Sequence, residues 1–503
     1  MNSAMLLILI LLPALAALLL PLARRFREPF VLAALLLETA GAVWLLLQKS
    51  AQLHLFNMTA ALPVGLRLDG VSKLFLLIAA VGYLLAGVYA FRYLKEGHER
   101  FFRFFLLSQA ALVGMCFAEN LVTMYLFFEM TTLLSMPLVL HDRTDEAIRA
   151  ALKYLFYSVA GAFLGLCFIF FYARYSLTLR FVPGGALDGA AVRGHETLMQ
   201  VVTFLGIVGF GAKAGLYPLH GWLPTAHPAA PAPASAILSG IIAKAGVLAI
   251  VRVLYYAVGA DFLRGTWVQT ALLALALLTV LMGSMMAYRE KLLKKRLAYS
   301  SVSQISYILV GLFVMTAESV SGALMHVLFH ACIKICLFLC AGSFIAVAGK
   351  HRVDELRGIG KAMPKTLWGF TLASLALIGI PPASGFVSKW YLAMGALDSG
   401  LTGDHATLYA KSTLDGITSI VYGSTMGAGV ALSGVAVFLY QGLITLCASF
   451  IAPFLSDVVI AEMKCVGSLL IIGLSFNMLG MTKIKVMNYV PAVFFPILLC
   501  TFM

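Results

Sequence analysis

Long apolar runs are the feature that most constrains what this chain can fold into. They recur at about the 20 residues that a membrane-spanning helix needs. Up to residue 392 they cover residues 4–22, 29–47, 71–91, 101–118, 120–140, 151–173, 198–219, 232–257, 267–287, 301–316, 321–348 and 366–392. They predict an all-α polytopic membrane protein with about twelve transmembrane helices. Later runs near 419–455, 465–480 and 488–502 predict a tail of three or four further membrane helices.

The composition excludes several classes of protein. Of the 503 residues, 61% are hydrophobic and 12% are charged, against about 45–50% and about 25% in globular proteins. Soluble domains cannot bury so large an apolar fraction, because their surface grows too quickly with size. A soluble enzyme, a nucleic-acid-binding protein and a disordered chain are therefore excluded.

The basic residues indicate an orientation in the membrane. The net charge is +14, and cytoplasmic loops of membrane proteins collect Lys and Arg. The clusters Arg24/Arg25/Arg27 and Lys350/Arg352 follow odd-numbered predicted helices. This bias predicts that the N-terminus lies outside.

Ionisable residues in the middle of a membrane span cost several kcal/mol each by most estimates and call for a reason, and seven of those in the predicted spans are candidates for a functional role. They are Glu129, Lys213, Lys244, His326, His330, Lys334 and Lys389. His326, His330 and Lys334 are spaced i, i+4, i+8 and so share one helical face. Any one of the lysines alone could snorkel or pair structurally. Seven titratable groups on five helices favour a functional role.

Two predicted helices carry helix-breaking residues beside these charges. Pro218 and Gly221 follow Lys213 in helix 7, and Pro381, Pro382 and Gly385 precede Lys389 in helix 12. A broken helix frees backbone groups, which the membrane tolerates only where protein or water satisfies them. Paired broken helices in two halves of a chain indicate a transporter site built from repeats. Two independent proline kinks are the structural alternative.

Proton transfer is the chemistry that these residue types permit. Burial and neighbouring charge control the proton affinity of a lysine, and histidine exchanges protons near neutral pH. A metal site at His326 and His330 is the competing interpretation, because i, i+4 histidines can bind zinc. A convincing third ligand is missing and Lys334 adds positive charge, so no metal is expected. No redox cofactor is expected either, because the chain has no cysteine cluster for iron–sulfur and no dinucleotide-binding glycine motif.

Several stretches resemble one family, the antiporter-like, proton-translocating membrane subunits of respiratory complex I, membrane-bound hydrogenases and Mrp-type sodium/proton antiporters. The most specific is KAGLYPLHGWLPTAHPAAPAPASAILSGIIAKAG at 213–246. KKRLAYSSVSQISY (294–307), HVLFHACIKICLF (326–338) and GIPPASGFVSKWYL (379–392) support it. Together these stretches place residues 1–395 in an antiporter-like domain.

The resemblance implies a fold and a role for each site residue. It implies fourteen helices with two inverted five-helix repeats, each with one broken helix, helices 7 and 12; the second repeat of this chain can be incomplete. Glu129 looks like the carboxylate that pairs with Lys213, and Lys244 looks like the central lysine on helix 8. His326, His330 and Lys334 resemble the helix 11 relay, and Lys389 resembles the terminal lysine on helix 12. The resemblance further implies a multi-pass protein of the bacterial inner membrane.

Residues 396–503 depart from this pattern. The stretch SGLTGDHATLYAKSTLDGITSIVYG and the helices after it resemble the C-terminal half of a different, uncharacterised bacterial integral-membrane family. The stretch GALDSGL (395–401) fits both families. We therefore predict a join at this point and a chimeric chain, natural or artefactual. Divergence of a lipid-facing end is the alternative.

The sequence therefore predicts a non-redox, proton-translocating subunit of an energy-converting oxidoreductase, a hydrogenase or an Mrp-type antiporter complex. Its expected partners are other membrane subunits, the lipid bilayer and protons, with sodium open as a second coupling ion. A stand-alone secondary transporter of a small solute or cation and a partly folded, non-functional fusion remain as alternatives.

Overall fold

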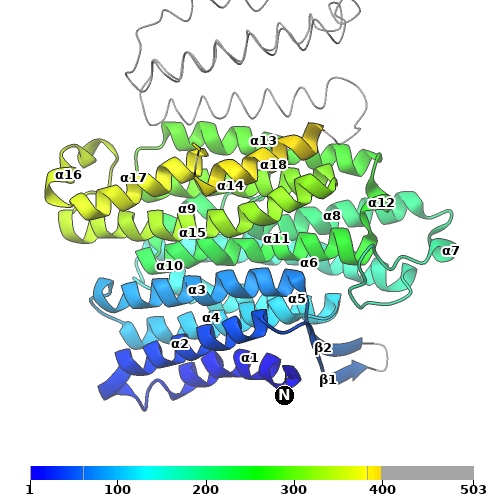
Figure 1. The fold of residues 1–503 in the computed structure, drawn as a ribbon, viewed down its shortest axis with the longest axis horizontal. Coiled ribbons are helices and arrows are strands. Elements are labelled where there is room, and N and C mark those ends of the chain that lie inside the picture. The colour runs from blue at the N-terminus through cyan, green and yellow to red at the C-terminus, as the bar shows by residue number, and fades with distance from the viewer. Residues whose placement is uncertain (1, 60–61, 382, 398–503) are drawn as a thin grey trace, which may run out of the picture. The chain divides into compact units, whose positions relative to one another are not determined.

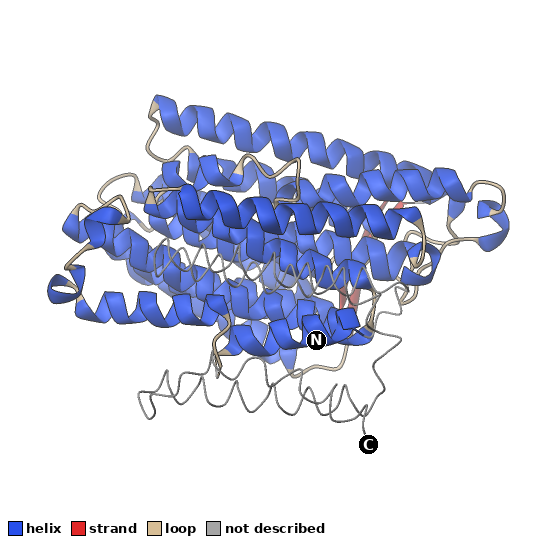
Figure 2. Cartoon of the chain, turned by 90° about the horizontal axis from the view of Figure 1, so that it is seen from above, coloured by secondary structure: helices blue, strands red, loops and turns tan. Residues whose placement is uncertain are grey.

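A computed structural model describes residues 2–59, 62–381 and 383–397. The predicted tail helices and Pro382 lie outside the described residues. The described part is a bundle of long helices with one β-hairpin (Figure 1), and Figure 2 shows the long helices running side by side.

The N-terminal half of the described chain contains the hairpin and most of the first broken helix. Its elements are α1 (Asn2–Leu19), η1 (Arg24–Phe26), α2 (Arg27–Leu46), β1 (Ala51–Thr59), β2 (Leu62–Leu68), α3 (Gly70–Tyr93), α4 (His98–Phe117), α5 (Leu121–Val139), α6 (Asp145–Tyr175), α7 (Gly189–Val192), α8 (Glu196–Ala214) and α9 (Leu223–Ala229).

The next helix is continuous along the chain but contains two π-helical segments. It comprises α10 (Ala232–Ile237), the π-helical η2 (Leu238–Ile242), α11 (Ala243–Arg252) and the π-helical η3 (Val253–Val258). The remaining elements are α12 (Ala260–Leu263), α13 (Trp267–Arg289), α14 (Leu293–Val314), α15 (Ala317–Ala348), η4 (Asp354–Leu356), α16 (Ile359–Ala362), α17 (Pro364–Ile378) and α18 (Ser384–Leu397).

Ten helices of the described residues are long and apolar enough to cross a membrane. Two of the predicted spans are not among them. The span 4–22 corresponds to α1, whose apolar part is the shorter segment Ser3–Leu19, and the span 366–392 is divided into α17 and α18.

The β-hairpin lies between the predicted spans 29–47 and 71–91, in a segment for which no strand was predicted. Strands β1 and β2 pair antiparallel, from Ala51 opposite Leu68 to Thr59 opposite Leu62. Figure 1 places the hairpin at the same end of the bundle as α7 and α12, with α16 at the opposite end. These two ends are called the hairpin end and the α16 end below.

The core of the bundle is formed by the α10–η3 helix. Every residue of its membrane-length window is buried, whereas helices at the periphery expose apolar side chains such as Phe156 and Phe170 of α6. Such a gradient suits a membrane, because an apolar outer face contacts lipid without cost while the polar groups lie inside. The site residues lie around this central helix.

Candidate functional site: a row of buried lysines and histidines

The first break separates α8 from α9. Helix α8 ends at Ala214, and Gly215 follows with a φ of +85°, a backbone conformation that favours glycine. The indole Nε1 of Trp222 donates to the carbonyl of Ala212 at 2.8 Å. Pro218 and Gly221 both lie in the non-helical segment between the two helices.

Lys213, in the last turn of α8, reaches across to α5 and is fully buried. Its Nζ donates to the Phe128 carbonyl at 2.7 Å and to the Thr131 hydroxyl at 2.6 Å, and lies 3.9 Å from the centre of the Phe128 ring. Two polar acceptors and an aromatic face thus surround the ammonium group, which suits a cation.

Glu129 lies beside this contact without forming an ion pair. It interacts electrostatically with Lys213, but its Oε1 is enclosed without a hydrogen-bond partner among the described residues. The geometry therefore holds Lys213 on neutral oxygens, with the half-buried Glu129 carboxylate nearby.

Lys244 lies at the start of α11, next to the π-helical segment. Its Nζ donates at 2.5 Å to the carbonyl of Ser239, which lies in the π-helical segment, and such segments are frequent at functional sites. The Ser239 hydroxyl is 2.6 Å from that of Ser301 in α14. These contacts connect the central lysine to α14.

Helix α15 presents His326, His330 and Lys334 on one buried face. Lys334 donates to the Leu297 carbonyl at 2.9 Å and to the Ser300 hydroxyl, both in α14. The rings of His326 and His330 are parallel with centroids 5.8 Å apart.

The two histidines have different surroundings. His326 Nδ1 is 2.9 Å from the Ser388 hydroxyl and its Nε2 is 3.2 Å from Gln304 Oε1. Both ring nitrogens of His330 are enclosed without hydrogen-bond partners among the described residues. His330 interacts electrostatically with Lys244, Lys334, His326 and Lys389, so it lies among the basic groups of the second half of the site.

The second break separates α17 from α18. Helix α17 ends at Ile378, and Gly379 follows with a φ of +92°. Lys389 of α18 donates to the carbonyls of Leu377 and Ile378 at 3.0 and 2.9 Å. The last carbonyls of a helix lack intrahelical donors and carry its partial negative charge, so the lysine caps the half-helix before it.

One cavity touches the partners of three of these residues. It measures about 290 Å³ and lies between α13, α14, α15 and α17. Its lining includes the residues that bind Lys334 (Leu297, Ser300), His326 (Gln304) and Lys389 (Leu377, Ile378). Three hydroxyls, of Ser284, Ser303 and Ser374, lie on the same walls. Most of the lining surface is apolar, with these hydroxyls set into it, and the cavity is large enough to hold water.

His227 is a buried histidine that the sequence analysis did not single out. It belongs to α9, both of its ring nitrogens lack partners among the described residues, and its ring stacks on Phe338 at 4.8 Å. It interacts electrostatically with Lys334, Lys294 and Lys244. The feature of the sequence that could have indicated His227 is its position within the stretch 213–246.

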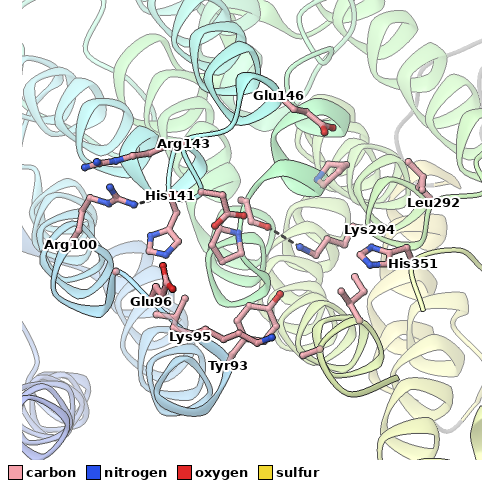
Figure 3. Close-up of a pocket in the computed structure, with 18 residues that line it drawn as sticks. Tyr93, Lys95, Glu96, Arg100, His141, Arg143, Glu146, Leu292, Lys294 and His351 are labelled. Carbon is pink, nitrogen blue, oxygen red and sulfur yellow. Dashed lines mark hydrogen bonds between the residues drawn. The ribbon is translucent and has the colours of Figure 1, made fainter. Parts of the chain in front are cut away.

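A larger cavity opens next to His227 at the α16 end. It measures about 1130 Å³ and is lined by Pro228, Ala230 and charged loop residues. Figure 3 shows Lys294 and His351 on one side and Arg100, His141 and Glu96 on the other. Lys294 donates to the Ala230 carbonyl at 2.8 Å. The described residues contain no group of three or more His, Cys, Asp or Glu side chains that could hold a metal ion.

Comparison with known proteins identifies the family. Residues 118–418 match the family described as NADH:quinone oxidoreductase/Mrp antiporter, transmembrane. The chain belongs to this family. The resemblance predicted from the sequence motifs is thereby confirmed.

Relatives within the NADH:quinone oxidoreductase/Mrp antiporter family extend over most of the chain. NADH-quinone oxidoreductase subunit N of Desulforudis audaxviator is 36% identical over 80% of this chain and 81% of its own length. A subunit of the Na(+)/H(+) antiporter of Bacillus subtilis is 31% identical over 69% of this chain and 70% of its own length. The match to hydrogenase-4 component B of Escherichia coli, at 32% identity, covers 65% of this chain and half of that protein.

Solved structures of the same fold are membrane complexes. A chain of the membrane-bound sulfane sulfur reductase, an archaeal respiratory complex, matches with a TM-score of 0.73 and 25% identity, covering 89% of this chain and 95% of its own. A chain of the Mrp complex from Dietzia sp. matches with a TM-score of 0.74 and 24% identity over 86% of this chain and 80% of its own, which shows the shared fold.

The C-terminal residues match a second family. Residues 391–501 match a protein family of unknown function, DUF554. This agrees with the prediction that the tail resembles a different membrane-protein family. The two matches overlap at 391–418, close to the predicted join.

Proposed function

We propose that this chain is the proton-translocating membrane subunit of an energy-converting complex of the NADH:quinone oxidoreductase, hydrogenase or Mrp antiporter type. The proposal rests on the row of buried basic side chains between the two helix breaks. Within the described part of the chain, Lys213, Lys244 and Lys334 are each held by backbone or hydroxyl oxygens and by no carboxylate. A structural lysine inside a membrane would ordinarily be paired.

Protons pass in this proposal along Glu129–Lys213–Lys244–His330/His326–Lys334–Lys389. Because burial and neighbouring charge set the proton affinity of a lysine, a change in the distance between Glu129 and Lys213 changes whether Lys213 holds its proton. The hydroxyls of Ser239 and Ser301 and the 290 Å³ cavity supply polar steps between the later groups. The coupling ion is a proton, with sodium as an alternative for an Mrp-type complex.

Access from the α16 end runs through the 1130 Å³ cavity and His227. Pro228, the residue after His227, lines that cavity together with Lys294. His227 interacts electrostatically with Lys294 and also with Lys244 and Lys334 of the row. A neutral histidine can accept a proton on one nitrogen and release one from the other. His227 is therefore the proposed link between the cavity and the central lysines.

The proposal extends to the finer architecture. It takes α1 and the broken pair α17/α18 as spans in addition to the ten, which gives twelve, and relates the helices as two inverted repeats. Support comes from the directions of the half-helices: α8 follows α7 at the hairpin end, whereas α17 follows α16 at the opposite end (Figure 1). The basic loops favour a bacterial inner membrane protein with its N-terminus outside.

We also propose a domain boundary between residues 395 and 396. The antiporter-like domain would comprise residues 1–395, and residues 396–503 would be a segment of different ancestry. The overlap of the two family matches supports a join in this region. Such a chimera would lack the family's own helix beyond Lys389, so the last proton transfer would need a partner subunit or the foreign tail.

The direct test is Lys213→Ala in the assembled complex, purified from native membranes and reconstituted in vesicles. The expected result is loss of proton pumping, measured with a pH-sensitive dye, while the other subunits still co-purify. Lys361→Ala is the matched control, because Lys361 lies exposed at the α16 end. Undiminished pumping by the Lys213 variant would reject the relay.

The stand-alone transporter makes the opposite prediction. The purified chain alone, in liposomes, would then move a solute or cation without other subunits. The proposed function predicts no such transport and predicts co-purification with several membrane subunits. A pull-down from native membranes distinguishes the two.

A further inference from the structure

Helices α1 to α4 hold a buried carboxyl group that does not belong to the row. Glu38 of α2 is 0% exposed, and neither of its carboxyl oxygens has a hydrogen-bond partner among the described residues. Gln109 of α4 is also 0% exposed, and both atoms of its amide lack partners. Polar groups buried without partners are rare and call for an explanation.

The helix contacts place Glu38 and Gln109 at the same height along the axis of α3, which is called their level below. A Cβ on Gly87 of α3 would meet both Leu35 of α2 and Phe105 of α4, so these three residues lie together. Helices α2 and α4 both run antiparallel to α3, because Thr39 reaches the Ala80 carbonyl and Tyr83 reaches Ser108. Glu38 and Gln109 lie one turn beyond Leu35 and Phe105 in the same direction, and positions three or four apart share a helix face.

Among the described residues, the polar groups that these contacts place at this level are the uncharged side chains of Thr39, Tyr83 and Ser108. The Tyr83 hydroxyl is 2.9 Å from the Ser108 hydroxyl, and Tyr83 is the titratable residue that α3 brings to this level. Helix α1 contains no Asp, Glu, Lys, Arg or His. It contains Pro13, which has no N–H to donate to the Leu9 carbonyl, and Leu9 packs against Gly41, one turn from Glu38.

A carboxylate without a counter-ion or a hydrogen-bond donor is costly to bury, and such groups bind a proton instead. Protonation removes the charge of Glu38 and with it most of the cost of burying the group. We propose that Glu38 is a proton-binding site in the α1–α4 layer, exchangeable with solvent and separate from the row of lysines and histidines.

Infrared spectroscopy of the assembled complex in vesicles tests this site. The difference spectrum between wild type and Glu38→Gln at neutral pH is expected to contain the carbonyl band of a protonated carboxyl group, shifting in D₂O. Glu28→Gln is the matched control, because Glu28 lies exposed in the first turn of the same helix and should give carboxylate bands. Glutamine keeps the shape of Glu38, so both variants are expected to assemble.

Three results would overturn the proposal. Carboxylate bands from Glu38 at neutral pH, as from Glu28, would show that it is charged. A protonated band that does not shift in D₂O would show a sealed acid that exchanges nothing. Replacement of the protonated band by carboxylate bands on adding sodium at constant pH would show a sodium site. None of these results depends on whether the lysine row carries protons.

Discussion

At both helix breaks, the last carbonyls of the first half-helix need hydrogen-bond donors, and different groups supply them at the two breaks. At the first, the backbone closes the end of α8 through the Leu216 N–H bonded to the Gly211 carbonyl, and Trp222 binds the Ala212 carbonyl. At the second, two of the last carbonyls of α17 receive their hydrogen bonds from a lysine of the following half-helix, Lys389.

At the first break, the groups that close the helix end are different from the lysine proposed to carry protons. At the second break, one lysine has both roles. Lys213 takes no part in closing its own break, since its ammonium group binds α5. Lys389 both caps α17 and occupies the terminal position of the proposed relay. Loss of proton transfer in a Lys389 variant therefore has two explanations, and stability measurements are needed to separate them.

The largest effect is expected from Gly385→Ala, in the second break. A Cβ at this position would overlap the backbone carbonyl oxygen of Ala376, so α17 and α18 would have to separate. Such overpacking costs about 3 kcal/mol of unfolding free energy. Thermal unfolding of the assembled complex measures it, with Gly189→Ala as control because its added Cβ meets nothing within 4 Å. Equal melting temperatures for both variants would contradict the close approach of the two half-helices.

The second largest effect is expected as a difference in stability between Lys389→Met and Lys213→Met. Lys389→Met leaves two helix-end carbonyls without their donor, whereas after Lys213→Met the Thr131 hydroxyl still donates to the Phe128 carbonyl at 2.7 Å. An unsatisfied buried acceptor costs about 1–3 kcal/mol. Lys389→Met should therefore be the less stable variant by about 2 kcal/mol in thermal unfolding. A Lys213 variant as unstable as the Lys389 variant would remove the distinction between the breaks.

Much of this architecture could be predicted from the sequence because it follows from apolar run length and from proline and glycine. The runs 71–91 and 120–140 correspond closely to α3 and α5. The run 366–392 predicts a single span broken at Pro381, Pro382 and Gly385, whereas α18 begins at Ser384, before Gly385, and continues past the run to Leu397. Apolar content cannot show where a half-helix resumes, because the cap of α17 comes from a side chain eleven and twelve residues away.

Other features depend on tertiary contacts that no local pattern encodes. The resemblance implied Glu129 as the partner of Lys213, but the lysine binds Phe128 and Thr131 on the same helix, because a rotation of α5 decides which group faces α8. The π-helical turns before and after α11 leave no clear periodicity, whereas the hairpin at 51–68 does show apolar residues at alternate positions, such as Leu62, Val64 and Leu66. Glu38 was within a predicted span and was overlooked, since its lack of a partner is visible only in three dimensions.

A smaller effect is expected at the first break from Trp222→Phe. The change removes one of two donors to the Ala212 carbonyl, since the Gly215 N–H also donates to it at 3.2 Å. It keeps an aromatic ring against Tyr154, whose ring centroid is 4.5 Å from that of Trp222. One lost hydrogen bond corresponds to about 1 kcal/mol of unfolding free energy, measured by thermal unfolding of the assembled complex. A cost as large as that of Lys389→Met would show that Trp222, too, is essential for closing its break.

The smallest effect is expected from Gly221→Ala, which completes the comparison with Gly385. Its new Cβ would approach the Tyr157 hydroxyl at 3.2 Å and the Lys153 side chain at 3.8 Å. Both are ends of partly exposed side chains that can shift, whereas the backbone carbonyl facing Gly385 cannot. Alanine also restricts the unfolded chain, which offsets any crowding, so the melting temperature should change by the equivalent of less than about 0.5 kcal/mol. A destabilisation equal to that of Gly385→Ala would mean that the first break is packed as tightly as the second, and that the lysine cap is not what distinguishes them.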